Sequence, residues 1–183
     1  MFAQFIITLL ILFVTAENTN DFVRPLDPKL FSSNEKLSHF RFYWHDTLSG
    51  HNPSSITVIP SSFKWNSTSV FGLVNIFENP LTLGPQSNSK LVGKAQGFYA
   101  SASQTEVDML VVMNFAFTEG KYNGSTITLL GRDPIFDKVR EMPVIGGTGL
   151  FRFARGYAQL STHWFSPLTK DAIVQYNLYV MHY

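Results

Sequence analysis

Short runs of β-type residues, separated by turn residues, constrain this chain more than any other feature. From Leu37 onward Phe, Tyr, Val, Ile and Thr crowd the runs, and no window shows a sustained apolar period of 3.6 residues. Dipeptides such as Asn79-Pro80 and Asn123-Gly124 are typical of turns, the second of a tight hairpin. The sequence therefore predicts an all-β domain, a sandwich or a barrel, with eight antiparallel strands at residues 38–47, 56–60, 69–78, 90–102, 108–119, 124–132, 153–164 and 171–182.

The N-terminal segment predicts secretion. Residues 1–16, MFAQFIITLLILFVTA, contain an uncharged apolar stretch that is shorter than the roughly 20 residues of a bilayer span. Val14 and Ala16 match the small-residue pattern of a signal-peptide cleavage site, although no Lys or Arg precedes the stretch. A buried N-terminal strand or helix is the alternative. Residues 17–36 are polar, so we expect a flexible arm there, then one domain over residues 37–183 and no membrane span in the mature form.

Composition narrows the classes of function. The chain has 183 residues, of which 45% are apolar, and a formal net charge of +1. These values fit one domain with a core, and without a basic run nucleic acid is not an expected partner. The absence of cysteine excludes disulfides, thiol chemistry and cysteine-ligated metal. Asn66-Ser67-Thr68 and Asn123-Gly124-Ser125 match the N-glycosylation pattern, which agrees with secretion and places both asparagines on exposed turns.

The segment DMLVVMNFAFTEG is apolar on both faces of its predicted strand. Met109, Met113 and Phe117 fall on one face, and Leu110 and Val112 fall on the other. An antiparallel strand with one wet face alternates, so this strand should be covered twice, by the interior and by another sheet or subunit. The sequence thus predicts an oligomer. A central strand of a sandwich with loops over it is the alternative.

Acids on apolar strand faces mark the candidate chemistry. In FRFYWHD, alternation places Phe42, Trp44 and Asp46 on one face, and Asp133 ends a similar apolar face. Both acids would then point into one barrel interior. An apolar pocket raises the pKa of a carboxyl group, and a second carboxyl nearby raises it further, which yields a proton donor near neutral pH. Alternatively each aspartate caps a turn, since the residues that follow are turn-like.

Other kinds of site find little support. His39 and His45 share the opposite face but stand six residues apart, roughly 20 Å along a strand, so they cannot bind one metal ion. Residues 146–149 are glycine-rich but lack the lysine of a phosphate loop, and no Gly-x-Ser-x-Gly motif occurs. Arg140 could hold a carboxylate or a phenolic oxygen, or pair with a surface acid. Aromatic residues make up 15% of the chain, enough to line a cavity for flat phenolic ligands or simply to fill a core.

Four motifs resemble, in order and spacing, those of plant dirigent proteins: HFRFYWHDTLSG, LVGKAQGFYASAS, MNFAFTEGKYNGSTITLLGRDP and VREMPVIGGTGLFRFARGYAQ. The resemblance runs from about Phe40 to Tyr183, and the wording is most similar to the branch that contains pterocarpan synthases. It implies an eight-stranded antiparallel β-barrel of the allene oxide cyclase-like kind, a homotrimer, often glycosylated and secreted to the plant apoplast or cell wall. It also implies no cofactor and no metal, because proteins of this family have no oxidising centre and cooperate with a laccase or peroxidase.

The resemblance also assigns positions to the site. Many members of the pterocarpan branch carry Asn where this chain has Asp133, and the retained acid keeps both functions of the family open. The catalytic residues implied are Asp46, Asp133 and Arg140. The substrate-binding residues expected are Tyr99 of the QGFY motif, Tyr176 on the last strand, and the ring-bearing Phe42 and Trp44.

Two functions follow from this resemblance. In the first, the protein steers phenoxy-radical coupling of phenylpropanoids to one stereoisomer, giving lignan-type products, and the acids protonate a quinone methide. In the alternative, a pterocarpan synthase-type reaction, the acids help an isoflavanol lose water and a quinone methide is trapped by an internal phenol. A third class is a cell-wall binding or structural protein whose acids only cap turns.

Overall fold

The computed structural model describes residues 35–61 and 69–183. The predicted signal peptide, nearly all of the predicted arm and Asn66 lie outside the described residues. Two short 3-10 helices, η2 (Gly120–Tyr122) and η3 (Gly149–Phe151), lie in connections. The strands of the described part are β1 (Lys36–Asp46), β2 (Ser55–Ile59), β3 (Val74–Thr82), β4 (Leu91–Ser101), β5 (Asp108–Phe117), β6 (Thr126–Pro134), β7 (Arg140–Thr148), β8 (Arg155–Phe165) and β9 (Ala172–His182).

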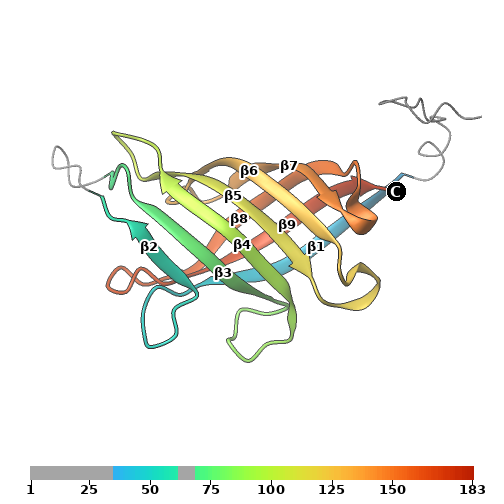
Figure 1. Ribbon diagram of the computed structural model, residues 1–183, viewed down its shortest axis with the longest axis horizontal. Helices are drawn as coiled ribbons and strands as arrows, with labels where there is room; N and C mark the ends of the chain where they lie inside the picture. The colour runs from blue at the N-terminus through green and yellow to red at the C-terminus, as the bar shows by residue number, and fades with distance from the viewer. Residues whose placement is uncertain (1–34, 62–68) are drawn as a thin grey trace, which may run out of the picture. The chain divides into compact units, whose positions relative to one another are not determined.

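The strands form one antiparallel sheet that closes into a barrel (Figure 1). Neighbours follow the order β1-β9-β8-β7-β6-β5-β4-β3, and β1 then pairs with β3 where Tyr43 meets Thr82. Eight strands therefore make the ring. β2 stands outside it, because it pairs only with the first part of the β3 edge whose last part pairs with β1. The predicted all-β barrel of eight antiparallel strands is confirmed.

Two strand predictions are wrong in detail. Residues 140–148 fell between two predicted strands, yet they form β7. The ladder between β6 and β7 ends at Val144, next to Pro143, which cannot donate a hydrogen bond. The third strand was expected at residues 69–78 but runs from Val74 to Thr82, so the predicted turn at Asn79-Pro80 lies inside β3. The run at 56–60 is β2, outside the ring.

The connection between β5 and β6 also differs from its prediction. Asn123-Gly124 was expected to form a tight hairpin, but it ends a longer loop that contains η2. Gly124 has a φ of +79°, in the left-handed region that glycine tolerates. Asn123 is exposed on this turn, as expected for a residue of the glycosylation pattern.

Alternation along the strands separates the interior from the outside. On β5, Met113 and Phe115 are fully buried, whereas Leu110 on the opposite face is 41% exposed. On β1, Phe42 and Trp44 are buried on the same face as Asp46. The period-two reading of both strands is confirmed, and both faces of β5 are apolar while only the inner one is covered in this chain. In the described part, no helix is both long enough and apolar enough to cross a bilayer.

Gly97 on β4 allows the close approach of β4 and β5. A Cβ atom at this position would stand 2.0 Å from the carbonyl oxygen of Val112 and 2.8 Å from the Cα of Met113. Because neither backbone atom can move without breaking the ladder, we expect Gly97→Ala to lower the free energy of unfolding by about 1–3 kcal/mol or more. Urea denaturation followed by tryptophan fluorescence measures the change.

The matched control for this prediction is Gln96→Ala on the same strand. Gln96 is exposed on the outer face, so its truncation should change the free energy of unfolding by only about 0.5 kcal/mol. Equal stability of the Gly97→Ala variant and the wild type would contradict the close-approach explanation.

Candidate functional site

Asp46 is the last residue of β1 and is only 6% exposed. Its Oδ1 accepts hydrogen bonds from Ser55 Oγ and, at 3.0 Å, from Asn79 Nδ2, and its Oδ2 accepts one from the Tyr99 hydroxyl at 3.0 Å. Asn75 Nδ2 donates in turn to the Tyr99 oxygen at 2.7 Å. Burial raises the pKa of Asp46, and the three side-chain donors partly offset the rise because they favour the charged carboxylate. Asp46 is thus a buried acceptor that fixes the Tyr99 hydroxyl.

Asp46 does not cap the turn that follows it. All three of its donors are side chains on β2, β3 and β4. The backbone amides of the turn, at Leu48 and Ser49, instead donate to the carboxylate of Asp171 on the loop before β9. The alternative reading of Asp46 as a turn cap is therefore wrong.

Asp133 and Arg140 form a buried pair across the β6–β7 connection. Asp133 is 8% exposed and Arg140 is 3% exposed. Arg140 Nε lies 2.8 Å from Asp133 Oδ1, without the geometry of a hydrogen bond, so the contact is an ion pair. Arg140 Nη1 donates to the carbonyl of Ile135 and to Thr162 Oγ1, both at 2.7 Å. Burial raises the pKa of Asp133 to about 6, although the charge of Arg140 lowers it. A neutral carboxyl is thus available in mildly acidic solution.

Tyr176 on β9 interacts electrostatically with both acids. Burial raises its pKa well above 10, and the charges of Asp133 and Asp46 raise it further while Arg140 lowers it. The ring of Tyr176 stacks on Phe42, with centroids 5.8 Å apart and planes at 13°, and meets Trp44 edge-on at 6.5 Å. The ring-bearing residues proposed for substrate binding on β1 and β9 therefore lie together on the inner wall, within electrostatic reach of both acids.

The sequence analysis expected each acid to raise the pKa of the other. In the structure the two acids do not have this effect. For Asp46 the carboxylate that adds to the effect of burial is Asp171. For Asp133 it is Asp108 and, after it, Asp137, both smaller in effect than burial and Arg140. Asp46 and Asp133 therefore face the same interior from separate surroundings, and each has its own neighbouring charge.

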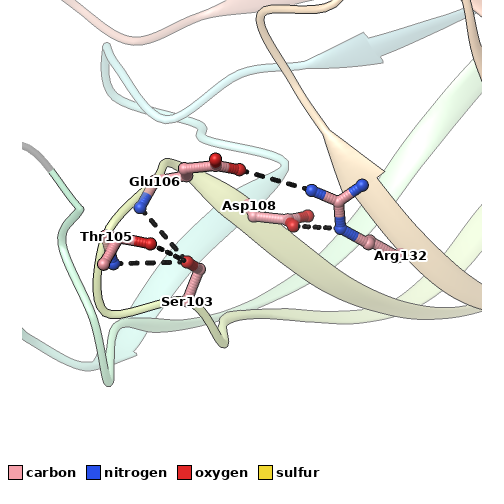
Figure 2. Close-up of polar contacts among 5 residues, drawn as sticks. All are labelled: Ser103, Thr105, Glu106, Asp108 and Arg132. Atoms are coloured by element: carbon pink, nitrogen blue, oxygen red, sulfur yellow. Dashed lines mark hydrogen bonds and ion pairs between the residues drawn. The ribbon is translucent and has the colours of Figure 1, made fainter.

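Asp108 belongs to a charged cluster that sequence reasoning missed. It is the first residue of β5, is 7% exposed and contacts Arg132 Nε through one oxygen, while its other oxygen has no partner (Figure 2). Glu106 reaches the same guanidinium, with Oε2 3.4 Å from Nη2. Ser103 Oγ accepts the backbone amides of Thr105 and Glu106 and so orders the β4–β5 loop. This cluster brings a negative charge close to Asp133.

Two of the three hydrogen-bonding partners of Asp46, Ser55 and Asn79, were also missed, as was Asn75, which bonds the third partner, Tyr99. Asn79 was read as a turn residue, and Asn75 and Ser55 were not considered. The signal was available for the two asparagines, because Asn75 and Asn79 share the inner face of β3 with the buried Phe77. A polar residue on an apolar strand face, which pointed to Asp46, points to them as well. Ser55 has no such signal, because it lies one residue before the strand predicted at residues 56–60.

Aromatic rings occupy the interior beside the acids. The Phe115 ring lies 5.0 Å from that of Phe42 and 5.3 Å from that of Tyr176, between centroids. A cavity of about 390 Å³ opens elsewhere, beside the part of β1 that does not pair with β3, and reaches Phe42 but neither acid. A second one, of about 400 Å³, borders Trp164 and Ile173. Neither of these two cavities is lined by Asp46 or Asp133.

The histidines do not converge. His39 Nε2 donates to Asn177 Oδ1 at 3.1 Å, and His45 contacts Thr82 Oγ1 at 2.7 Å on the outer side of β1. Among the described residues, His, Asp and Glu side chains form no group of three that could hold a metal ion. Asp133 can transfer a proton, and Asp46 and Tyr99 form hydrogen bonds at the same end of the barrel.

Comparisons with known proteins identify the family of this chain. The sequence model described as Dirigent-like protein matches residues 37–181. The chain belongs to the dirigent family. Dirigent protein 7 of Arabidopsis thaliana is 52% identical over 93% of this chain and 90% of its own length. Pterocarpan synthase 1 of Glycyrrhiza echinata is 48% identical over 81% of this chain and 80% of its own length.

Solved dirigent structures share the barrel. A pterocarpan synthase dirigent protein superimposes with a TM-score of 0.82 and 45% identity, covering 88% of this chain and 99% of the other. Another gives a TM-score of 0.76 and 46% identity, covering 81% and 96%. The resemblance inferred from the four motifs, including the link to the pterocarpan synthase branch, is therefore confirmed.

Proposed function

We propose that this dirigent protein binds a phenolic substrate at the end of its barrel that holds Asp46 and Asp133, here called the acid end. It then removes water from a benzylic alcohol of the substrate, after which a ring closes. The proposal rests on the state of Asp133. Burial raises its pKa to about 6, so it can donate a proton beside the Arg140 cation. Relatives named pterocarpan synthases, at 47% and 48% identity, support this reaction class.

The reaction balances without an oxidant. Asp133 gives its proton to the benzylic hydroxyl, the C–O bond breaks, and water leaves with the bonding electrons. A phenolic hydroxyl of the same substrate loses its proton, which restores Asp133, and becomes the carbonyl of a quinone methide. An internal phenol then forms a new C–O bond at the methide carbon while its proton passes to that carbonyl oxygen. The net change is the loss of one water.

The neighbours of Asp133 and Asp46 support these steps. Arg140, 2.8 Å from Asp133, stabilises the carboxylate that remains once the proton has left. The Tyr99 hydroxyl donates to Asp46 and accepts from Asn75, so its remaining lone pair can accept a hydrogen bond from a substrate hydroxyl. Asp46, with donors on both oxygens, orients Tyr99 instead of giving up a proton.

The decisive assay uses the purified protein with a 4-hydroxyisoflavan and no oxidant. We expect loss of one water and one dominant enantiomer, detected by mass spectrometry and chiral chromatography. Unchanged substrate, or a racemic product at the rate seen without protein, would remove this proposal.

A second candidate is the direction of phenoxy-radical coupling to a lignan-type product, in cooperation with a laccase or peroxidase. The 52% identical relative, whose name says only that it is a dirigent protein, favours keeping it. The same acids would protonate the carbonyl oxygen of a quinone methide before ring closure. Coupling of a monolignol by a laccase separates the two candidates, because a racemic product in the presence of this protein would count against radical direction.

We further propose that the protein works as a homotrimer. One outward residue from each of five neighbouring strands forms an outer apolar row, in register across the sheet: Ile56, Ile76, Phe98, Val112 and Leu130. Four of the five are 39–54% exposed, and a contiguous apolar surface of this kind supports burial against another copy.

A charge in the outer apolar row should break the oligomer. We expect Phe98→Glu to shift the protein to a monomer in light scattering coupled to size-exclusion chromatography, because a buried unpaired carboxylate is costly at an interface. Gln96→Glu is the matched control, since Gln96 lies on the same strand and face but is already polar. An unchanged mass for the Phe98→Glu variant would place the interface elsewhere.

We also propose that the protein acts outside the cell, in the apoplast or cell wall, on the basis of the N-terminal pattern and the exposed Asn123. Expression of the full chain in plant cells should give secreted protein whose mass falls on glycosidase treatment. Asn123→Gln and Asn66→Gln variants report which site is occupied. Retention of the unprocessed chain inside the cell would contradict the proposal.

A further inference from the structure

Asp171 connects two loops at the acid end of the barrel. Its Oδ1 accepts the backbone amides of Leu48 at 2.8 Å and Ser49 at 3.0 Å. Its Oδ2 accepts the hydroxyls of Ser49 at 2.6 Å and Thr169 at 2.8 Å. Four donors therefore converge on one carboxylate, three of them from a loop more than one hundred residues away in the sequence.

The two loops are internally ordered but joined at few points. In the loop after β1, the carbonyl of Thr47 accepts the amides of Ser54 at 2.9 Å and Ser55 at 3.0 Å. In the loop before β9, Lys170 donates to the carbonyl of Ser166 at 2.8 Å. Within the part of the chain that the structure describes, the hydrogen bonds found between residues 47–54 and 166–171 all end on the carboxylate of Asp171. One side chain therefore holds two stiff segments together.

This contact lies directly beside Asp46. Asp46 pairs with Ala172 in the sheet. The loop after β1 therefore starts one residue after Asp46, and the loop before β9 ends one residue before Ala172. Partial burial acts to raise the pKa of Asp171, but its four donors hold it below the ordinary value, and it is ionised at neutral pH. Tyr99 and Tyr176, which also interact electrostatically with Asp46, have raised pKa values and stay neutral. Asp171 is thus the charged neighbour of Asp46, and its charge adds to the effect of burial on the pKa of Asp46.

We propose that Asp171 is a positioning residue, which latches the loop after β1 to the loop before β9 and so fixes the end of β1 that carries Asp46. The inference rests on the proposed function, since the position of Asp46 sets the orientation of the Tyr99 hydroxyl toward a substrate. Asp171 itself touches no reacting atom. It acts through the geometry and the charge state of Asp46.

Two variants of the full chain separate the effect of the hydrogen bonds that Asp171 accepts from the effect of its negative charge. Asp171→Ala removes every acceptor, so hydrogen exchange of the Leu48 and Ser49 amides should become about tenfold faster or more, as expected for the loss of charge-assisted hydrogen bonds. Asp171→Asn keeps one acceptor oxygen but removes the charge. It should protect these amides better than Asp171→Ala, and the titration midpoint of Asp46, followed by carboxyl 13C NMR, should fall because the repelling charge is gone.

Thr169→Val is the control, because it removes the one donor that does not come from the other loop and leaves the charge in place. It should leave the Leu48 and Ser49 amides and the Asp46 midpoint close to the wild type. Unchanged exchange in Asp171→Ala, or an unchanged midpoint in Asp171→Asn, would overturn the inference. Neither measurement needs a substrate, so both can fail or succeed independently of the proposed function. With an accepted substrate, Asp171→Ala should lower kcat more than it raises KM, and an unchanged kcat would also overturn the positioning role.

Discussion

Asp133→Asn is expected to lower turnover of an accepted substrate by about 100-fold to 10,000-fold, the usual contribution of a general acid. The amide keeps the size of the side chain but cannot give up a proton at this step. In the wild type, the pKa of Asp133 is raised to about 6, so the neutral donor predominates below that pH and declines about tenfold for each unit above it. The pH profile of kcat/KM should therefore fall as pH rises through about 6, and the Asp133→Asn variant should lack this limb.

Asp46→Asn provides the matched control for this profile. It makes the same carboxyl-to-amide change at the other buried acid, which orients Tyr99 through a hydrogen bond. We expect lower activity in this variant but a limb that remains near pH 6. If the limb persisted in Asp133→Asn and vanished in Asp46→Asn, the roles assigned to the two acids would have to be exchanged.

Arg140→Met is expected to cost about 3–5 kcal/mol of unfolding free energy at pH 7.5, because it leaves the buried carboxylate of Asp133 without its cation. The loss should be smaller at pH 5, where Asp133 can become neutral. Arg140 lowers the pKa of Asp133, so its removal should raise that pKa above about 6 and move the activity limb to higher pH. Urea unfolding at the two pH values measures the difference.

The pH dependence of stability has a definite sign. The pKa of Asp133 is about 6 in the folded protein against an ordinary 3.8, so the folded state binds the proton more tightly than the unfolded chain does. This contribution to stability is complete below about pH 4 and is lost as pH rises through about 6. Removing Arg140 should raise the pKa of Asp133, so this contribution to stability should persist to a higher pH.

Two further variants test whether the ion pair with Asp133 accounts for the stability lost in Arg140→Met. Asp133→Asn combined with Arg140→Met removes both charges and should recover most of the stability lost at pH 7.5. Thr162→Val removes one hydrogen bond of Arg140 but keeps the pair, and should cost only about 1–3 kcal/mol at either pH. An equal loss in Arg140→Met at pH 5 and pH 7.5 would show that the pair with Asp133 is not what the arginine stabilises.

The inward position of Asp46 and Asp133 could be predicted because strand alternation is a local property. Every second side chain of a strand meets the same face, so an acid that follows Phe42 and Trp44 at that spacing shares their surroundings. The strand β7 was not predicted, although its Arg140, Met142 and Val144 alternate and are all buried. Pro143 lies outward there, at the end of one ladder.

The charges around each acid could not be predicted in this way. Alternation names the face of a residue but not its partner on another strand, and Asp46 meets Tyr99 across 53 positions of sequence. Asp108 and Asp171 sit at strand ends, where their residue types favour turns, and no local pattern shows that they face Asp133 and Asp46. The expectation that the two acids would raise each other's pKa failed for this reason.

The sequence by itself determined the all-β class, the inner and outer faces of the strands, and the burial of two acids among rings, because a period of two residues acts through neighbours in the chain. Only the tertiary structure decided that β2 stays outside the ring, that Asp133 faces Arg140, and that Asp171 reaches Leu48 across 123 positions. Closure of the barrel sets these contacts, since it brings together strand ends that no local interaction connects.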